Sequence, residues 1–244
     1  MTILYVNGDS HSAGAEAVNA HVFAEDDYLY RGMGRRPHPD NERASYGCEL
    51  ANSLGYILVC DAEGASSNSR ILRTTQEYLK TNTPDLLIIG WSTWEREEWL
   101  HNDIYYQVTG GGTDNVPIEL HTRYKEWVVA QGELSRENKM LAWHGIIYKF
   151  HCELSALNIN HIFFNTYSNF SAIKDFRLKT EHSTTENAIC FDWGDSYVGP
   201  YDQHLTYFDW LKNAGFSTAN PSSYHFKANA HSAWANLLYK LLGK

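Results

Sequence analysis

The stretch TILYVNGDSHSAG, residues 2–14, decides the fold, because an apolar run ends directly in a group of reactive side chains. Residues 2–6 have the length and β-branched content of a strand, and Gly8 permits a tight turn after it. The carboxylate of Asp9 can accept hydrogen bonds from the backbone amides of such a turn. Ser10 is then expected to be exposed at the carboxyl edge of a sheet. The stretch therefore predicts a strand that presents a candidate nucleophile, although Asp-Ser-His also suits a turn or a helix cap.

Four further apolar runs of strand length lie at residues 55–60, 85–90, 161–166 and 188–193. They lack the alternation of a strand with one wet face, which is typical of a parallel sheet covered on both sides. Helical patterns alternate with them, at residues 46–54, 68–80, 133–157, 202–214 and 226–242. We expect one domain over residues 1–244, a three-layer α/β/α fold with a mostly parallel sheet of about five strands.

Two connections are longer or more polar than this fold needs, and both follow strand ends. We expect inserted loops near residues 101–132 and 168–187, and residues 101–120, with three consecutive glycines, are predicted to form a mobile surface loop. Parallel α/β sheets bind ligands at the carboxyl ends of their strands. Each segment is therefore either a lid or substrate wall, or ordinary surface decoration.

Composition excludes several classes of function. The formal net charge of -9 disfavours nucleic acid, which is usually bound by a basic surface. The first residues lack the basic and apolar stretches of a signal peptide or membrane span, so we expect a cytoplasmic protein without a membrane partner. The four widely spaced cysteines predict free thiols. Glycine-rich nucleotide motifs are missing, we expect no cofactor, and the oligomeric state is left open.

A nucleophilic serine needs a base, and the C-terminal segment offers one. Apolar residues repeat at helical spacing from Phe226 to Leu241, which places His225 at the mouth of a terminal helix. His231 lies on the helix itself and is interpreted as a packed core histidine. His225 is therefore the candidate base for Ser10.

The segment GDSHSAG, residues 8–14, resembles the first block of the SGNH (GDSL-type) hydrolases, and His225 followed by His231 matches the spacing of that family's last block. The resemblance implies an SGNH or flavodoxin-like architecture in which Ser10 attacks an ester carbonyl and His225 activates it. In the family an aspartate three residues before the histidine orients the ring, but here that position is Ser222. Another group must then orient His225, either a backbone carbonyl or an acid of the 192–209 segment (Asp192, Asp195, Asp202 or Asp209), or the site does not hydrolyse esters rapidly.

Two inner blocks agree with the family in position more than in letter: EGASSNSRI at residues 63–71 and GWST at residues 90–93. Ser67 occupies the place of the family's oxyanion glycine, and Ser92 that of its asparagine. The resemblance implies an oxyanion hole formed by the N–H groups of Ser10 and Ser67 with the Ser92 hydroxyl. Asp9, Asn68 and Ser222 are the expected supporting residues. The set of blocks resembles divergent SGNH-like proteins of large tailed phages, which would place the chain in the host cytoplasm or the virion.

Four residues near the strand ends are candidate substrate contacts: His11, Trp91, Trp94 and Arg96. The stretch WSTWEREEWL, residues 91–100, forms either an aromatic wall with a charged clamp or the first turns of an amphipathic helix. The guanidinium of Arg96 can hold a carboxylate or phosphate. Asp9-x-His11 also resembles the opening of calcineurin-like metallophosphatases, but the downstream motifs of that family are missing, so no metal site is predicted.

Two functions remain. The first is a serine hydrolase of SGNH type that acts on an O-acyl ester of a small molecule or glycan, or transfers the acyl group. The alternative is a degenerate SGNH domain that binds a ligand without catalysis or takes part in a virion or host interaction. Retention of Ser10 and His225 favours the hydrolase, whereas the replacements at Ser92 and Ser222 favour the binding protein.

Overall fold

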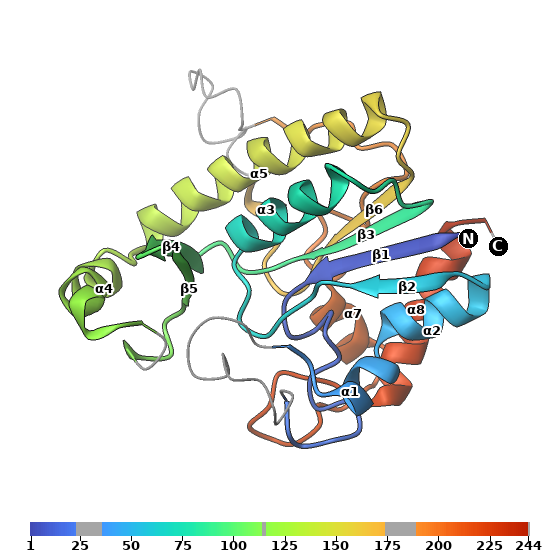
Figure 1. The fold of residues 1–244 in the computed structure, drawn as a ribbon, viewed down its shortest axis with the longest axis horizontal. Coiled ribbons are helices and arrows are strands. Elements are labelled where there is room, and N and C mark those ends of the chain that lie inside the picture. The colour runs from blue at the N-terminus through green and yellow to red at the C-terminus, as the bar shows by residue number, and fades with distance from the viewer. Residues whose placement is uncertain (23–35, 114–115, 174–188, 244) are drawn as a thin grey trace.

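The computed structural model describes residues 1–22, 36–113, 116–173 and 189–243. At its centre lies a sheet of four parallel strands in the spatial order β2-β1-β3-β6. These strands are β1 (Ile3–Gly8), β2 (Ile57–Cys60), β3 (Leu86–Trp91) and β6 (His161–Asn165). Helices cover both faces of the sheet (Figure 1), so the expected three-layer α/β/α class is confirmed.

The two faces of the sheet carry different helices and separate apolar clusters. One face is covered by α2 (Tyr46–Leu54), α7 (Tyr207–Asn213) and α8 (Ala228–Leu241), and short α1 (Pro39–Arg43) precedes α2. The other is covered by α3 (Asn68–Leu79) and α5 (Glu133–Ala156). Leu4 and Val6 of β1 pack with the first group and Tyr5 with the second. Because both faces are apolar, the strands show no alternation in their sequence.

The expected strand at residues 188–193 is not a strand in its described part, residues 189–193. Phe191 instead stacks on Tyr148 of α5, with ring centroids 3.9 Å apart. A later residue pairs with the edge strand β6: Tyr197 forms a parallel bridge to Phe163. Phe191 and Trp193 thus pack on a helix, and within the described residues a single bridge extends the four-stranded sheet.

The insertion after β3 contains regular structure where a loop was predicted. Strands β4 (Glu97–His101) and β5 (Ile104–Val108) form an antiparallel hairpin, followed by the 3-10 helix η2 (Ile118–Leu120) and α4 (His121–Val129). A small apolar cluster unites the hairpin with this segment: Trp99, Val108, Val116 and Tyr124. The helical alternative for residues 91–100 is therefore wrong, because residues 97–101 form a strand. The loop prediction for residues 101–120 is wrong for β5. Both strands form because their apolar side chains pack in this small cluster.

The second predicted insertion, residues 168–187, lies outside the described residues from 174 onward. All four cysteines are unpaired. Among the described residues, no helix has the length and apolar content needed to cross a membrane.

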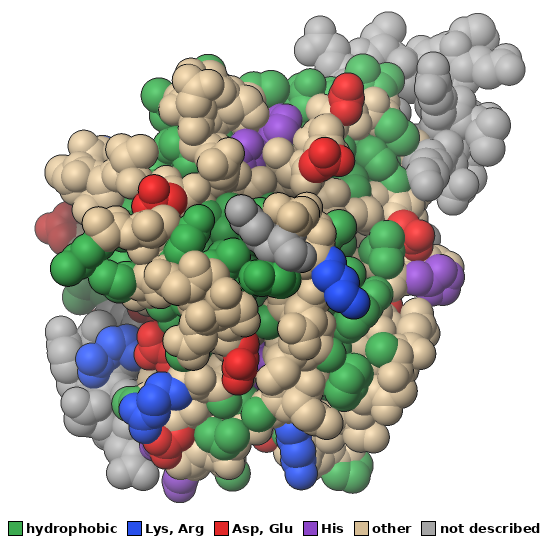
Figure 2. Space-filling model, turned by 90° about the vertical axis from the view of Figure 1, so that its right-hand side faces the viewer, with side chains coloured by type: hydrophobic (Ala, Val, Ile, Leu, Met, Phe, Trp, Pro, Cys, Tyr) green, Lys and Arg blue, Asp and Glu red, His purple; other side chains and the backbone are tan. Residues whose placement is uncertain are grey.

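The carboxyl ends of β1 and β3 define the place of the site. The chain leaves β1 toward α2 on one face and leaves β2 toward α3 on the other, so the connections diverge beside β1. Gly8 and Gly90 pair across the two strands. A Cβ at Gly90 would lie 2.6 Å from Ser12 Oγ, so only glycine lets the turn after β1 lie against β3. At the opposite end of the sheet, basic side chains are interspersed with acidic and hydrophobic ones (Figure 2).

Candidate active site

Three side chains from distant parts of the chain form a hydrogen-bonded row at this edge. Ser10 Oγ lies 2.9 Å from Nε2 of His225, and Nδ1 of the same ring lies 2.7 Å from Oε2 of Glu16. A carboxylate can only accept a hydrogen bond, so Nδ1 carries the proton and Nε2 is left to accept the Ser10 hydroxyl proton. The row therefore has the order of nucleophile, base and orienting acid used in acyl transfer.

Glu16 is fixed by several contacts that keep its side chain ionised. Asn220 Nδ2 donates to Oε1 at 2.9 Å, and the Ser223 hydroxyl donates to Oε2. Partial burial alone would raise the pKa of Glu16, but the hydrogen bonds from Ser223, His225 and Asn220 outweigh it and lower that pKa. A charged carboxylate thus faces the imidazole of His225.

Neither alternative for the group that orients His225 agrees with the structure. The acid comes from the turn that carries Ser10, six residues after that serine, and not from the 192–209 segment. Ser222 stands where the acid was sought, but it is exposed and its hydroxyl donates to Asn220. Glu16 has a φ of 61°, a left-handed value that turns the chain back toward His225. Sequence spacing gave no indication of this contact, because a left-handed glutamate has no sequence signature.

Asp9 lies buried next to Ser10, where three strands end. Its Oδ1 accepts from the backbone of His11, and its Oδ2 accepts from Ser92 after β3 at 2.8 Å and Thr166 after β6 at 3.2 Å. Nη1 of Arg96 donates to the same oxygen at 3.3 Å. Burial would raise the pKa of Asp9, but these neighbours together lower it. Asp9 therefore fixes the turn of Ser10 to the ends of β3 and β6.

The two other donors expected for the oxyanion hole are already engaged. The backbone N–H of fully buried Ser67 donates to Oε1 of Gln107 at 2.9 Å. The Ser92 hydroxyl donates its one proton to Asp9 and accepts from Arg96 at 2.9 Å. Neither residue lines the cavity beside Ser10. Their assignment as oxyanion donors is therefore corrected: Ser67 anchors the hairpin and Ser92 links Arg96 to Asp9.

Asn68 connects the same two loops. Its amide oxygen accepts from the backbone of Ser92 at 2.7 Å, and its amide nitrogen donates to the Ser92 carbonyl at 3.1 Å. The side chain is completely buried. Asn68 thus holds the start of α3 against the end of β3, in a supporting position.

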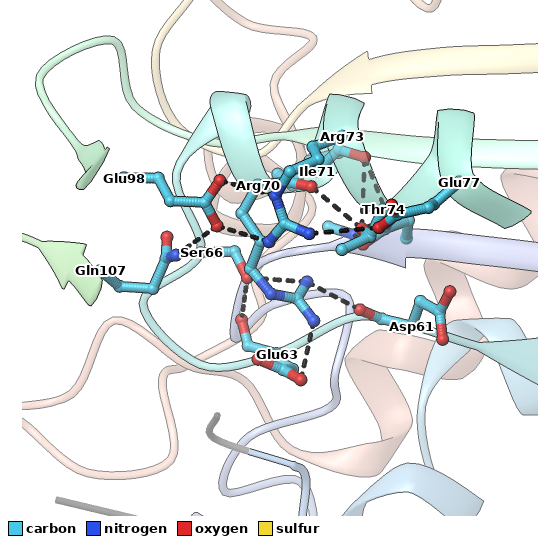
Figure 3. A network of polar contacts seen from close by, with 12 residues as sticks. Asp61, Glu63, Ser66, Arg70, Ile71, Arg73, Thr74, Glu77, Glu98 and Gln107 are labelled. Atoms are coloured by element: carbon cyan, nitrogen blue, oxygen red, sulfur yellow. Dashed lines mark hydrogen bonds and ion pairs between the residues drawn. The ribbon is translucent and has the colours of Figure 1, made fainter. Parts of the chain in front are cut away.

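A polar network fastens the β4–β5 hairpin to α3 (Figure 3). Arg73 of α3 contacts both oxygens of Glu98, at 2.9 and 2.7 Å. Gln107 donates to Glu98 at 2.9 Å and so joins this pair to the Ser67 N–H. One turn earlier, Arg70 holds the loop before α3 through Asp61, Glu63 and Ser66. The loop that faces Ser10 is therefore braced by two arginines of one helix.

A cavity of about 490 Å³ opens beside the row. Ser10 and His225 line it, together with Asp9, His11, Val22, Gly64, Ala65, Thr93, Arg96, Thr109, Tyr167 and Tyr224. Tyr167 and Tyr224 lie at its mouth, exposed by 45% and 64%, with ring centroids 6.2 Å apart. The cavity thus joins Ser10 and His225 to an aromatic entrance formed by two partly exposed rings.

The structure separates the four candidate substrate contacts into two pairs. His11 and Arg96 line the cavity. Trp91 is fully buried in the core, and Trp94 stacks on Phe170 with centroids 4.6 Å apart, so neither tryptophan lines the cavity. The aromatic wall comes instead from Tyr167 and Tyr224. Those residues lie in irregular segments, where sequence periodicity gives no signal.

The other two histidines of the site are buried and uncharged at neutral pH. Burial lowers the pKa of His11 to about 4, and the ring packs edge-on against His225 at 5.2 Å. Burial likewise lowers the pKa of His231 to about 3, and its ring lies near the Tyr207 hydroxyl on the core side of α8. His231 thus packs in the core, as its place on the helix indicated. Within the described residues, no group of three or more histidine, cysteine or acidic side chains could hold a metal ion.

The fold and the row of side chains define a class: an α/β protein with a serine, a histidine and a carboxylate at the carboxyl edge of a parallel sheet. No family model matches the chain, and no curated protein matches it. Solved structures do match, and three of them are carbohydrate or acetyl xylan esterases.

One is a carbohydrate esterase family 2 enzyme with a carbohydrate binding domain from Corynascus thermopiles (Myceliophthora fergusii), with 16% identity over 100% of this chain and 67% of that one, at a TM-score of 0.42. A second is a carbohydrate esterase whose active site is described as having divergent catalytic and non-catalytic binding functions (15% identity, 99% and 64% coverage, TM-score 0.48). A third is an acetyl xylan esterase from the rumen bacterium Butyrivibrio proteoclasticus, with 12% identity over 99% of this chain and 64% of that one, at a TM-score of 0.37. The chain spans about two thirds of these chains. At such identities, its function must be inferred from its own side chains.

Proposed function

We propose that this protein is a serine esterase that removes an acyl group from an oxygen ester. The single observation that carries the proposal is the row Ser10–His225–Glu16, with hydrogen bonds of 2.9 and 2.7 Å at the wall of a cavity. Of the two functions raised by the sequence, a binding protein has no need for this geometry. The ionised Glu16 also supplies the acid that Ser222 does not.

The reaction follows from the order of the row. Ser10 Oγ attacks the ester carbonyl while His225 Nε2 takes the hydroxyl proton, and Glu16 stabilises the resulting imidazolium. His225 then gives that proton to the departing alcohol oxygen, which leaves an acyl group on Ser10. Water, deprotonated by the same histidine, releases the carboxylic acid. An acceptor alcohol in place of water would give acyl transfer.

The aromatic entrance supports an ester carried by a carbohydrate. Tyr167 and Tyr224 present partly exposed rings next to His225, where the alcohol part of the substrate would leave. Aromatic rings of this kind bind the apolar faces of sugars. A glycan ester is therefore the proposed substrate class.

A fluorophosphonate probe and hydrolysis of 4-nitrophenyl acetate test the proposal. We expect the wild type to be labelled and to hydrolyse the ester, and Ser10→Ala to do neither, because the nucleophile is removed. Ser53→Ala, which changes an exposed serine on α2, is the matched control and should behave like the wild type. Folded wild type that is neither labelled nor active would overturn the proposal in favour of a non-catalytic binding protein.

A further inference from the structure

Arg96 lies where the proposed reaction would need a donor. Acyl transfer places a negative charge on the former carbonyl oxygen, and donors that are already in place stabilise it. The Ser67 N–H and the Ser92 hydroxyl are both donated to other protein groups and lie outside the cavity. Among the described residues that line the cavity, Arg96 is the one arginine or lysine.

The guanidinium of Arg96 is fixed at one end and open at the other. Its Nη1 donates to Ser92 Oγ at 2.9 Å, to Asp9 Oδ2 at 3.3 Å and to the Ser66 carbonyl at 3.4 Å. Within the described part of the chain, Nε and Nη2 have no hydrogen bond, and the side chain remains 25% exposed. A planar guanidinium held through one nitrogen keeps its remaining N–H groups in a fixed direction.

The charges around Arg96 favour a role at the reacting oxygen over recognition of an anionic substrate. Its positive charge is balanced by the buried carboxylate of Asp9, and His11 beside them is neutral because its pKa lies at about 4. The cavity wall therefore has little net charge to attract an anion. The N–H groups of Arg96 are nevertheless fixed hydrogen-bond donors, and such donors stabilise the negative charge that forms on the carbonyl oxygen during the reaction.

We infer that Arg96 is a catalytic residue that donates hydrogen bonds from its guanidinium to the oxyanion formed on a Ser10-bound ester. This role rests on the proposed esterase function and extends it. It also accounts for serine at position 92, because a hydroxyl there can accept from Arg96 and donate to Asp9 at the same time. The backbone N–H of Ser10 is the second donor in this arrangement.

Steady-state hydrolysis of 4-nitrophenyl acetate by Arg96→Ala tests the role. We expect kcat to fall about a hundred- to thousandfold with little change in KM, as for the loss of one oxyanion donor. Guanidinium chloride at non-denaturing concentration should restore part of kcat, whereas the same concentration of sodium chloride should not. Rescue distinguishes a donor from a residue that only supports the fold.

Two further variants keep the test decisive. Arg43→Ala removes an exposed arginine of α1 that pairs with Asp40 and does not line the cavity, and it should leave kcat near the wild-type value. If Arg96→Ala does not fold, Arg96→Lys is the alternative variant. Lysine keeps the positive charge beside Asp9 but lacks the planar set of guanidinium N–H donors, so its kcat should also fall at least tenfold. The role is overturned if the folded variant keeps kcat within about threefold of wild type, if Arg43→Ala loses as much, or if guanidinium rescues nothing. Wild type without any hydrolysis would instead overturn the esterase function itself, and this role with it.

Discussion

Glu16 combines a strained backbone with a position in the reactive row. Its φ of 61° is costly for a residue with a side chain, and such strain persists only where surrounding contacts determine it. Here Asn220 and Ser223 hold the carboxylate from the far end of the chain, and the Ala17 carbonyl accepts from the backbone of Ala228 at the start of α8. The N-terminal turn and the segment of His225 therefore position each other.

Replacement of Glu16 measures what the carboxylate contributes. Glu16→Gln keeps the size and an acceptor oxygen but removes the charge that stabilises the imidazolium, so we expect kcat for 4-nitrophenyl acetate to fall about a hundred- to ten-thousandfold. KM should change little, because Glu16 does not line the cavity. Glu119→Gln, at an exposed position of η2, serves as the control. Unchanged kcat in folded Glu16→Gln would show that Ser10 and His225 act without an acid.

At the scale of elements, a buried amide links the β4–β5 hairpin to the residue that caps the start of α3. Gln107 accepts from the Ser67 N–H and donates to Glu98, which Arg73 of α3 holds in turn (Figure 3). Thr109, the residue that follows β5 directly, belongs to the cavity wall. The attachment therefore connects the shape of the cavity to the position of α3.

Removal of that amide should destabilise the protein measurably. Gln107→Leu leaves the buried N–H of Ser67 without its acceptor, which costs about 1–3 kcal/mol of unfolding free energy. Tyr105→Phe, on the same strand, removes only a partly exposed hydroxyl and should change the free energy by less than about 0.5 kcal/mol. Urea unfolding of both variants provides the comparison, and equal stability of Gln107→Leu and wild type would contradict the assigned role.

Sequence periodicity predicted those elements whose burial follows from local pattern. Helix α2, whose apolar side chains gather on one face, was predicted with its observed bounds, and the long α5 was predicted to within one residue. The hairpin was missed because its hydrophobic side chains pack on Val116 and Tyr124 of the segment that follows it, in a small cluster separate from the two faces of the sheet. Ser10 and His225 could be proposed from sequence, since each lies next to a recognisable element end. Glu16, Gln107 and the link from Ser92 to Asp9 depend on contacts between chain segments, and residue spacing contains no information about them.

At the scale of the whole molecule, the site and the core are coupled through histidines that are buried without charge. His11 lies between the reactive row and the Tyr207 ring, and His231 lies near the same tyrosine from α8. Folding moves both imidazoles out of water into surroundings that disfavour their protonated forms. Proton binding by these two residues therefore opposes folding.

The resulting pH dependence has a definite sign. The pKa of His11 is lowered from 6.5 to about 4 and that of His231 to about 3, so between pH 6.5 and 5 the unfolded chain binds more protons than the folded one. The free energy of unfolding should fall over that window by roughly 1.6 kcal/mol for each histidine, because the slope grows from about 0.7 kcal/mol per pH unit at pH 6.5 toward about 1.4 at pH 5. Asp9 and Glu16 act at lower pH, because stabilisation from a carboxylate with a lowered pKa is complete above its unfolded value and is lost only below it.

Urea unfolding at several pH values between 6.5 and 5 measures how the free energy of unfolding changes with pH. A histidine variant then shows how much of this slope comes from His231. His231→Gln removes one of the buried histidines and should reduce the slope by up to about 1.4 kcal/mol per pH unit, even though the variant is less stable at every pH because the ring fills space in the core. His151 and His161, whose pKa is also lowered by burial, continue to contribute to the slope. His204→Gln, which changes an exposed histidine, should leave the slope unchanged. A slope that is the same in wild type and His231→Gln would mean that His231 is protonated in the folded protein, which its buried position beside Tyr207 argues against.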